Sequence, residues 1–213
     1  MDATNIWTLI EQRAEATPDA RMLVDQHGEE LTFAAYRERC EAVAAGLADL
    51  GVGADTIVSW QLPTWIESVV LVGALRRLGA IQNPILPIYR DREVGFVVGQ
   101  ARPRLLVVPS TWGGFDFGTM ADRLTEGTDT TVLRCDGPGD LPTGDPATLP
   151  AAPDDDMTAS DAPVRWLFYT SGTTSDPKGA QHGDLAIRTA ARGMAAGLDL
   201  RPDDRSALVF PFT

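Results

Sequence analysis

The sequence predicts an α/β protein with a mostly parallel sheet flanked by helices. Segments with the pattern of buried strands alternate along the chain with segments of helical periodicity. The strand-like segments are short and rich in Val, Ile and Leu, which is typical of parallel strands covered on both faces. With 213 residues, of which 44% are hydrophobic and 23% charged, the chain can form one sizeable core or two small domains.

The first 50 residues predict two helices separated by a hairpin. Asn5 is the expected N-cap of the first helix. Two strand-like segments, residues 20–25 and 30–33, flank a Gly-containing turn, which is the pattern of a β-hairpin. The second helix follows Thr32 and ends at Gly51. Its apolar residues recur at helical spacing and predict the face that packs on the core: Tyr36, Cys40, Val43, Ala44, Leu47 and Leu50.

The next segments predict the centre of the sheet. Residues 56–62 have the pattern of a buried strand, and Pro63 stands at the start of the following helix. That helix, residues 64–78, is apolar on nearly all sides, so we expect it inside the domain. A short strand is expected at 80–83. Helices and strands then continue to alternate, with helices at 91–100 and 117–125 and strands at 104–110 and 130–135.

Residues 136–163 interrupt this alternation. They contain six Pro, three Gly and seven Asp, and no Lys or Arg. This composition predicts a linker or a long surface loop with little that a core can use. Beyond it we expect a strand at 164–169, a loop, a helix at 183–196 and a last strand at 206–212. Because the chain stops within that apolar run, we expect it to be a fragment of a longer protein.

The charge and cysteine content exclude several classes of function. The formal net charge is −12, and the seven Asp of residues 136–163 supply −7 of it. No basic patch is visible, so nucleic acid is not an expected partner. The N-terminal segment lacks the pattern of a secretory signal, and the longest apolar run, residues 69–75, is too short for a membrane span. Cys40 and Cys135 lack paired spacing, which favours a reducing, cytoplasmic location without a metal site.

A loop rich in Gly, Ser and Thr, YTSGTTSDPKGA at residues 169–180, joins a predicted strand to a predicted helix. Glycines let backbone N–H groups converge on an anion, and hydroxyl and ammonium groups add donors. The following helix is expected to add the positive end of its dipole. A polar surface turn is the alternative, whereas a Walker loop is excluded because Lys178 precedes Gly179 instead of Ser or Thr. The side chains that could donate to an anion here are those of Ser171, Thr173, Thr174 and Lys178, but composition alone favours the polar turn.

The order of residues in this loop resembles the signature of the adenylate-forming enzymes. The family pattern is Y-T-S-G-T-T-G-x-P-K-G, and ten of its eleven positions match between Tyr169 and Gly179. The opening helix and the stretches TFAAYRERC, LGVGADTIVSWQLP and WIESVVLVGALRRLGAIQNPI are also similar to the N-terminal half of that family. The stretch NPILPIYRDREVGF is most similar to ligases of cyclic or medium-chain carboxylates, such as cyclohexanecarboxylate-CoA ligase.

The resemblance implies an ATP-dependent carboxylate–CoA ligase that uses ATP, Mg²⁺ and coenzyme A. The residues that it implies as binders of the ATP phosphates are Thr170, Ser171, Gly172, Thr173, Thr174 and Lys178. It implies that residues 1–135 and 164–213 belong to one large AMP-binding domain, with 136–163 as a linker or surface loop. The implied partner is a small-molecule carboxylate. An adenylation domain that loads a carrier protein is the alternative enzyme, and a nucleotide-binding fragment without chemistry is the alternative from another class.

Two departures from the family pattern affect these expectations. Ser175 replaces the usual Gly, at a strain cost on the order of 1 kcal/mol if that position needs a positive φ. The adenine, ribose and catalytic-lysine motifs of the family are absent from these 213 residues, so no catalytic residue is assigned here. We therefore expect the fragment to be inactive alone and able to self-associate through uncovered apolar surface. His182 matches a His common in the family, with capping of the next helix as the alternative.

Overall fold

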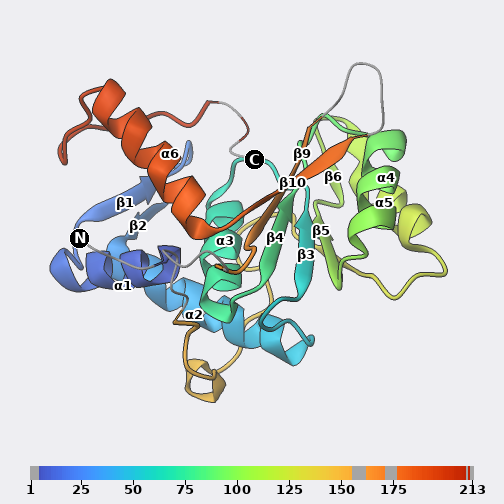
Figure 1. Ribbon diagram of the computed structural model, residues 1–213, viewed down its shortest axis with the longest axis horizontal. Coiled ribbons are helices and arrows are strands. Elements are labelled where there is room, and N and C mark those ends of the chain that lie inside the picture. Colours follow the sequence, from blue (N-terminus) through green and yellow to red (C-terminus); the bar gives the residue numbers. More distant parts are fainter. Residues whose placement is uncertain (1–4, 155–161, 171–176, 210, 212–213) are drawn as a thin grey trace.

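The computed structural model describes residues 5–154, 162–170, 177–209 and 211. A six-stranded sheet runs through the molecule in the order β10-β9-β4-β3-β5-β8, with helices on both sides (Figure 1). The predicted α/β fold with a mostly parallel sheet is therefore confirmed. The strands of this sheet are β3 (Ile57–Trp60), β4 (Ile81–Pro84), β5 (Leu105–Val108), β8 (Thr131–Arg134), β9 (Trp166–Thr170) and β10 (Lys178–His182). The helices are α1 (Ile6–Ala16), α2 (Phe33–Asp49), α3 (Ile66–Leu78), α4 (Asp91–Ala101), α5 (Phe117–Thr125) and α6 (Asp184–Gly197).

Four strands form the parallel centre of the sheet. β3 pairs in parallel with β4 on one side and with β5 on the other, and β5 pairs in parallel with β8. Every residue of β5 is buried, as expected of a parallel strand that is covered on both faces. β9 joins the other edge of β4, and the antiparallel strand β10 completes the sheet.

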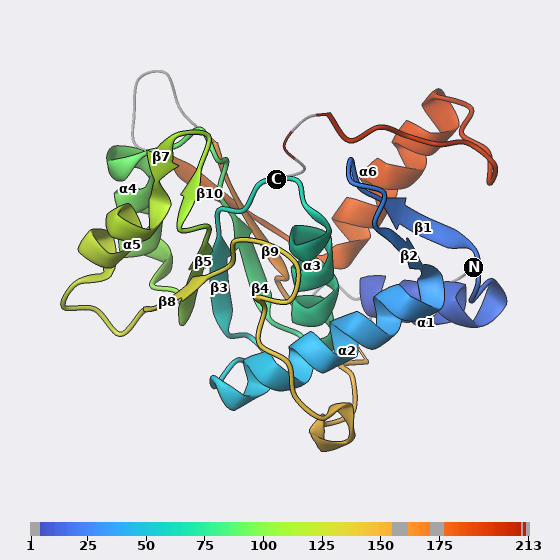
Figure 2. The same ribbon diagram turned by 180° about the vertical axis from the view of Figure 1, so that it is seen from behind.

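Hydrophobic cores cover both faces of the sheet. α1, α2 and α3 lie on one side, and α4 and α5 lie on the other (Figures 1 and 2). α3 contacts both α2 and β4, and its Val70, Leu71, Ala74 and Leu75 are fully buried, which confirms the position predicted from its apolar sequence. Within the described part of the chain, no helix has the length and apolar character that crossing a bilayer requires.

α2 and α3 approach each other closely at Gly73. A Cβ atom at this position would lie 2.4 Å from Cys40 Sγ and 2.6 Å from the Tyr36 hydroxyl oxygen. The Tyr36 hydroxyl donates a hydrogen bond to the backbone carbonyl of Val69 (2.9 Å). Because both neighbours are fully buried, a larger residue at position 73 has no space to occupy.

Both cysteines are buried and are expected to be unreactive in the folded chain. Burial is the main cause that raises the pKa of Cys40 to about 12 and the pKa of Cys135 to about 12. At pH 8 the native thiols are therefore protonated, and only the thiolate attacks alkylating reagents. We expect iodoacetamide to modify neither cysteine in the native protein and both in urea, as counted by mass spectrometry. Rapid native labelling of either thiol would contradict its burial.

The segment after β8 contributes to the core more than its composition predicts. Leu141 is buried in the cluster formed by α2 and α3, and Leu149 packs against it from beyond the short 3-10 helix η1 (Pro146–Thr148). The backbone N–H of Gly144 donates to the carbonyl of Ala42 on α2 (2.9 Å). The expectation that this segment offers little to a core is wrong for residues 136–154, because Leu141 is buried there and the backbone of Pro142 and Thr143 lies directly on α2 at Gly46. The division into domains stays a prediction.

The smaller elements differ from the sequence-based expectation in two places. The hairpin of β1 (Arg21–Val24) and β2 (Glu30–Thr32) forms as predicted. A second hairpin, β6 (Thr111–Trp112) with β7 (Phe115–Asp116), was not predicted, since its strands have two residues each. The strand expected at 206–212 is wrong for the residues described there, 206–209 and 211, because none of them pairs with a strand.

Candidate functional site

The β9–β10 hairpin holds the ends of the predicted phosphate loop. Its five register pairs run from Trp166 opposite His182 to Thr170 opposite Lys178. Thr170 and Lys178 therefore face each other at the loop end of the hairpin, where residues 171–177 connect the two strands, and both are exposed. The loop residues Ser171, Gly172, Thr173 and Thr174 lie outside the described residues, and so does Ser175. Their predicted roles stay predictions.

The helix that follows the loop does not direct its N-terminus at it. The sequence predicted one continuous loop from 170 to 182, but β10 occupies Lys178–His182 and separates the loop from α6. α6 begins at Asp184, near the opposite end of the hairpin from Thr170 and Lys178. The predicted contribution of this helix dipole is wrong, because the dipole effect falls off within about one turn.

Tyr169 fixes the hairpin against α4 near the loop. Its hydroxyl donates to Gln100 Oε1 (2.8 Å), and partial burial raises the pKa of the Tyr169 phenol. Its ring lies across the backbone of Gly179, its register partner on β10. A Cβ atom at Gly179 would lie 3.0 Å from the ring carbon that bears the hydroxyl. The glycine after Lys178 therefore leaves room for this ring.

Substitution of this glycine is expected to displace the Tyr169 ring. Gly179→Ala should lower the free energy of unfolding by about 1 kcal/mol, because crowding at a packed contact has costs of this size and the bond to Gln100 is lost. Urea denaturation measures the change. Gly193→Ala is the matched control, since a Cβ there meets nothing within 4 Å and Ala favours the helix interior, so stability should rise. An equal decrease in both variants would contradict the argument.

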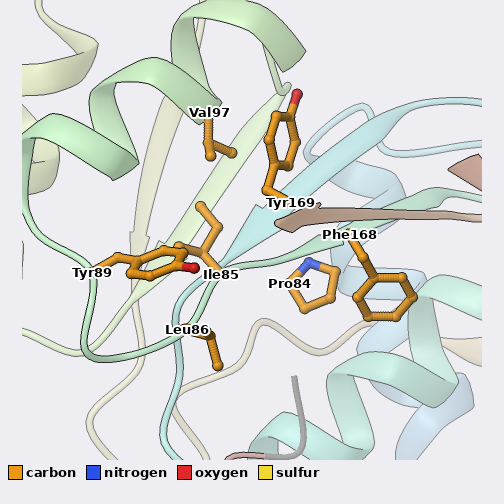
Figure 3. Close-up of a pocket in the computed structure, with 7 residues that line it drawn as sticks. All are labelled: Pro84, Ile85, Leu86, Tyr89, Val97, Phe168 and Tyr169. Atoms are coloured by element: carbon orange, nitrogen blue, oxygen red, sulfur yellow. The ribbon is translucent and has the colours of Figure 1, made fainter. Parts of the chain in front are cut away.

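A small cavity separates the hairpin from β4 and α4 (Figure 3). Its volume is about 70 Å³, far below the roughly 300–1,000 Å³ of clefts that enclose drug-sized ligands, so it is not by itself a substrate pocket. Gln61 holds one wall in place by donating to the carbonyls of Leu86 (2.8 Å) and Tyr89 (3.0 Å). The cavity includes two β9 residues that precede the predicted phosphate loop, and it is lined by Pro84, Ile85, Leu86, Tyr89, Val97, Phe168 and Tyr169.

His182 does not cap α6. The N-cap is Gly183, which has no side chain that could cap the helix. The centre of the His182 ring lies 5.9 Å from the centre of the Phe168 ring. The capping alternative is therefore wrong because His182 ends β10 instead, while the family-based role of this histidine stays a prediction.

The exposed donors at the loop end of the hairpin suit a polyphosphate. Lys178 offers a compact ammonium group and Thr170 a hydroxyl group, both of which donate to phosphate oxygens. Within the described ranges, no group of three or more His, Cys, Asp or Glu side chains is placed to hold a metal ion. Both donors suit the phosphate oxygens of a nucleotide, a ligand that commonly brings bound Mg²⁺ with it.

Comparison with known sequences identifies related synthetases and ligases. The chain is 26% identical over 211 residues to long-chain-fatty-acid--CoA ligase FadD13 of Mycobacterium tuberculosis, covering 97% of this chain and 40% of that protein. It is 31% identical over 219 residues to 2-hydroxy-7-methoxy-5-methyl-1-naphthoate--CoA ligase of Streptomyces carzinostaticus, covering 93% and 38%. It is also 28% identical over 204 residues to the probable non-canonical nonribosomal peptide synthetase CymA of Salinispora arenicola, covering 92% and 2%.

Solved structures show the same fold. The N-terminal domain of FACL13 from Mycobacterium tuberculosis matches with a TM-score of 0.79 at 23% identity, covering 98% of this chain and 51% of that one. A long-chain-fatty-acid CoA ligase described as putative, from Rhodopseudomonas palustris, matches with a TM-score of 0.80 at 21% identity, covering 99% and 52%. The family model described as AMP-binding enzyme matches residues 10–213. The chain belongs to the AMP-binding enzyme family.

Proposed function

We propose that this chain is part of an ATP-dependent carboxylate–CoA ligase and supplies its phosphate-binding loop. The observation that carries the proposal is the loop end of the β9–β10 hairpin, where Thr170 and Lys178 face each other on either side of residues 171–177. Both side chains are exposed and available to a ligand. The CoA ligases among the relatives support this reaction class.

The composition of the chain gives Lys178 particular weight. It is the single lysine among 18 basic residues, and the other 17 are arginine. Arginine is the better residue for planar, bidentate contacts, whereas lysine provides a compact and mobile point charge. The chain has arginine at the other 17 Lys or Arg positions and has lysine at position 178, where the predicted phosphate loop ends. The same residue is therefore the first one to test.

In the proposed reaction, a carboxylate oxygen of the substrate attacks the α-phosphorus of ATP, and pyrophosphate leaves with the electron pair of the broken bond. The thiol of coenzyme A then attacks the acyl carbonyl, and AMP leaves. Thr170, Ser171, Gly172, Thr173, Thr174 and Lys178 would hold the β- and γ-phosphates during the first step. Their contribution is positioning and charge stabilisation, and Mg²⁺ bound to the nucleotide would neutralise further charge.

The acceptor in the second step has a second candidate. The relatives include the nonribosomal peptide synthetase CymA and tyrocidine synthase 2 of Brevibacillus parabrevis, which favours an adenylation domain that loads a carrier protein. The chain spans 40% or less of the length of the curated relatives named above. We therefore assign acceptor and substrate choice to the whole protein, whose catalytic residues we place beyond these 213 positions, and we expect this chain alone to complete no turnover.

ATP–pyrophosphate exchange with the whole protein tests the proposed function. A panel of medium-chain, cyclic and aromatic carboxylates, each incubated with ATP, Mg²⁺ and labelled pyrophosphate, should give exchange with at least one acid. Addition of coenzyme A or of a phosphopantetheinylated carrier protein then identifies the acceptor by the thioester formed. The absence of exchange with every acid of the panel would count against the ligase reaction.

A further inference from the structure

Asp184 is fully buried and bonded to three other segments. Its Oδ2 accepts hydrogen bonds from Arg76 Nε (3.0 Å) and from the backbone N–H of Ile6 (2.9 Å), and it lies 2.8 Å from Arg76 Nη2. Its Oδ1 accepts from Trp166 Nε1 (3.0 Å). The side chains of Asp184 and Arg76 are 0% and 1% exposed. These contacts therefore join four elements at one fully buried point: α1, α3, β9 and α6. We call these four residues the Asp184 clamp.

The Asp184 clamp lies at the root of the β9–β10 hairpin. Trp166 begins β9, and its register partner His182 ends β10 two residues before Asp184. The backbone N–H of Arg165 donates to the carbonyl of His182 (2.9 Å), and that of Gln82 donates to the carbonyl of Arg165 (2.9 Å). Both strands of the hairpin are thus fixed at the same end, next to the edge of β4.

The hairpin separates from the sheet beyond this root. In the part of the chain that the structure describes, Gln82 opposite Trp166 is the one register pair between β4 and β9. Farther along, the cavity of Figure 3 lies between hairpin and sheet, and the Tyr169–Gln100 bond is exposed. At about 3.3 Å per residue, Thr170 at the loop end of the hairpin is roughly 13 Å from Trp166 at the root. The direction of the hairpin therefore depends on how firmly its root is held and on the exposed contact of Tyr169 with α4.

We propose that Asp184 is a positioning residue that orients Thr170 and Lys178, which flank the predicted phosphate loop, through the root of the β9–β10 hairpin. This inference rests on the proposed function of the loop. A buried ion pair is often no more stabilising than an apolar pair of similar volume, so its value here is the fixed direction of four bonds. At the length given above, a tilt of about 15° at the root moves Thr170 and Lys178 by roughly 3 Å, enough to break contacts with phosphate.

Distance measurement between two spin labels tests this role in the chain itself. We would attach one label at Thr170→Cys, at the loop end of the hairpin. The other label would be at Glu126→Cys, an exposed position just after α5. The native thiols are buried, with pKa values of about 12, and stay unlabelled. Trp166→Phe removes one bond of the clamp and keeps the ion pair, whereas Asp184→Asn with Arg76→Met removes the ion pair without leaving a buried charge.

Glu67→Gln is the matched control. Glu67 is buried on α3 and paired with Arg39, so its loss also destabilises the protein, but this ion pair joins α3 to α2 instead of to the hairpin. We expect electron–electron resonance to show a distance distribution that is shifted or widened by about 3 Å in the double variant, less in Trp166→Phe, and unchanged in Glu67→Gln.

A distribution that stays unchanged in both clamp variants, or one that widens equally in Glu67→Gln, would overturn the inference. The spin-label distances do not depend on ATP. Failure of pyrophosphate exchange in the unsubstituted whole protein would therefore reject the proposed function, but the distances would still show whether Asp184 orients the hairpin. If exchange is present, the clamp variants should raise the KM for ATP in the whole protein, and Glu67→Gln should not.

Discussion

Replacement of Arg76 by Met is expected to lower the free energy of unfolding by about 3–5 kcal/mol. The guanidinium group is 1% exposed and paired with the fully buried carboxylate of Asp184. Removal of the cation leaves that carboxylate fully buried, with the backbone N–H of Ile6 and the indole N–H of Trp166 as its other described donors. An unpaired buried charge is one of the largest single costs in a folded protein. Urea denaturation followed by circular dichroism measures the change.

A double variant separates this explanation from simple loss of packing. When Asp184→Asn is added to Arg76→Met, neither charge of the Arg76–Asp184 pair remains, so the double variant should be more stable than Arg76→Met alone. Such non-additivity is the signature of two residues that interact directly. A double variant that is less stable than Arg76→Met would show that the carboxylate is stabilised by groups other than Arg76.

Lys178→Ala is expected to slow the adenylation step of the whole protein by a factor of about 10²–10³, the usual effect of removing one group that stabilises transition-state charge. Thioester formation from a synthetic acyl-adenylate should change little, because the β- and γ-phosphates are absent from that step. Rapid-quench measurement of each half-reaction tests the split.

Arg205→Ala is the control for Lys178→Ala, since it removes another exposed cation far along the chain from the loop. It should leave both half-reactions unchanged. Equal losses in the two half-reactions of Lys178→Ala would reject the assigned role of Lys178 and would point to a general effect on folding.

The parallel sheet and most of its helices could be predicted from the sequence because their signals are local. Runs of Val, Ile and Leu marked β3, β5 and β8, and the expected helix at 117–125 coincides with α5 (Phe117–Thr125). β3 and β5 are buried and α5 buries one face, so the burial that stabilises these elements also imposes the apolar pattern from which they are predicted.

β10 could not be predicted in this way. Its sequence, Lys-Gly-Ala-Gln-His, has no alternation of apolar residues and low intrinsic preference for a strand. It is a strand because β9 pairs with it over five residues, and this contact is invisible to local pattern. The segment at 206–209 shows the opposite error, since its apolar residues have a strand-like pattern but the described residues find no partner strand.

The Asp184 clamp was missed because its members are far apart in sequence, with 108 positions between Arg76 and Asp184. One signal was nevertheless present. Arg76 lies in a helix that the sequence itself places inside the domain, and a buried guanidinium needs an acidic partner. The partner could not be identified from the sequence, because 30 Asp and Glu residues offer too many choices.

Protection of Lys178 by nucleotide tests the central claim most directly. The whole protein would be treated with an amine-modifying reagent at increasing MgATP, and modification of the peptide that contains Lys178 would be followed by mass spectrometry. As Lys178 is the single lysine of this chain, its peptide reports on the loop without ambiguity. Our account predicts that MgATP slows modification of Lys178, with half-maximal protection at the concentration that half-saturates pyrophosphate exchange. Unchanged modification at saturating MgATP would contradict it.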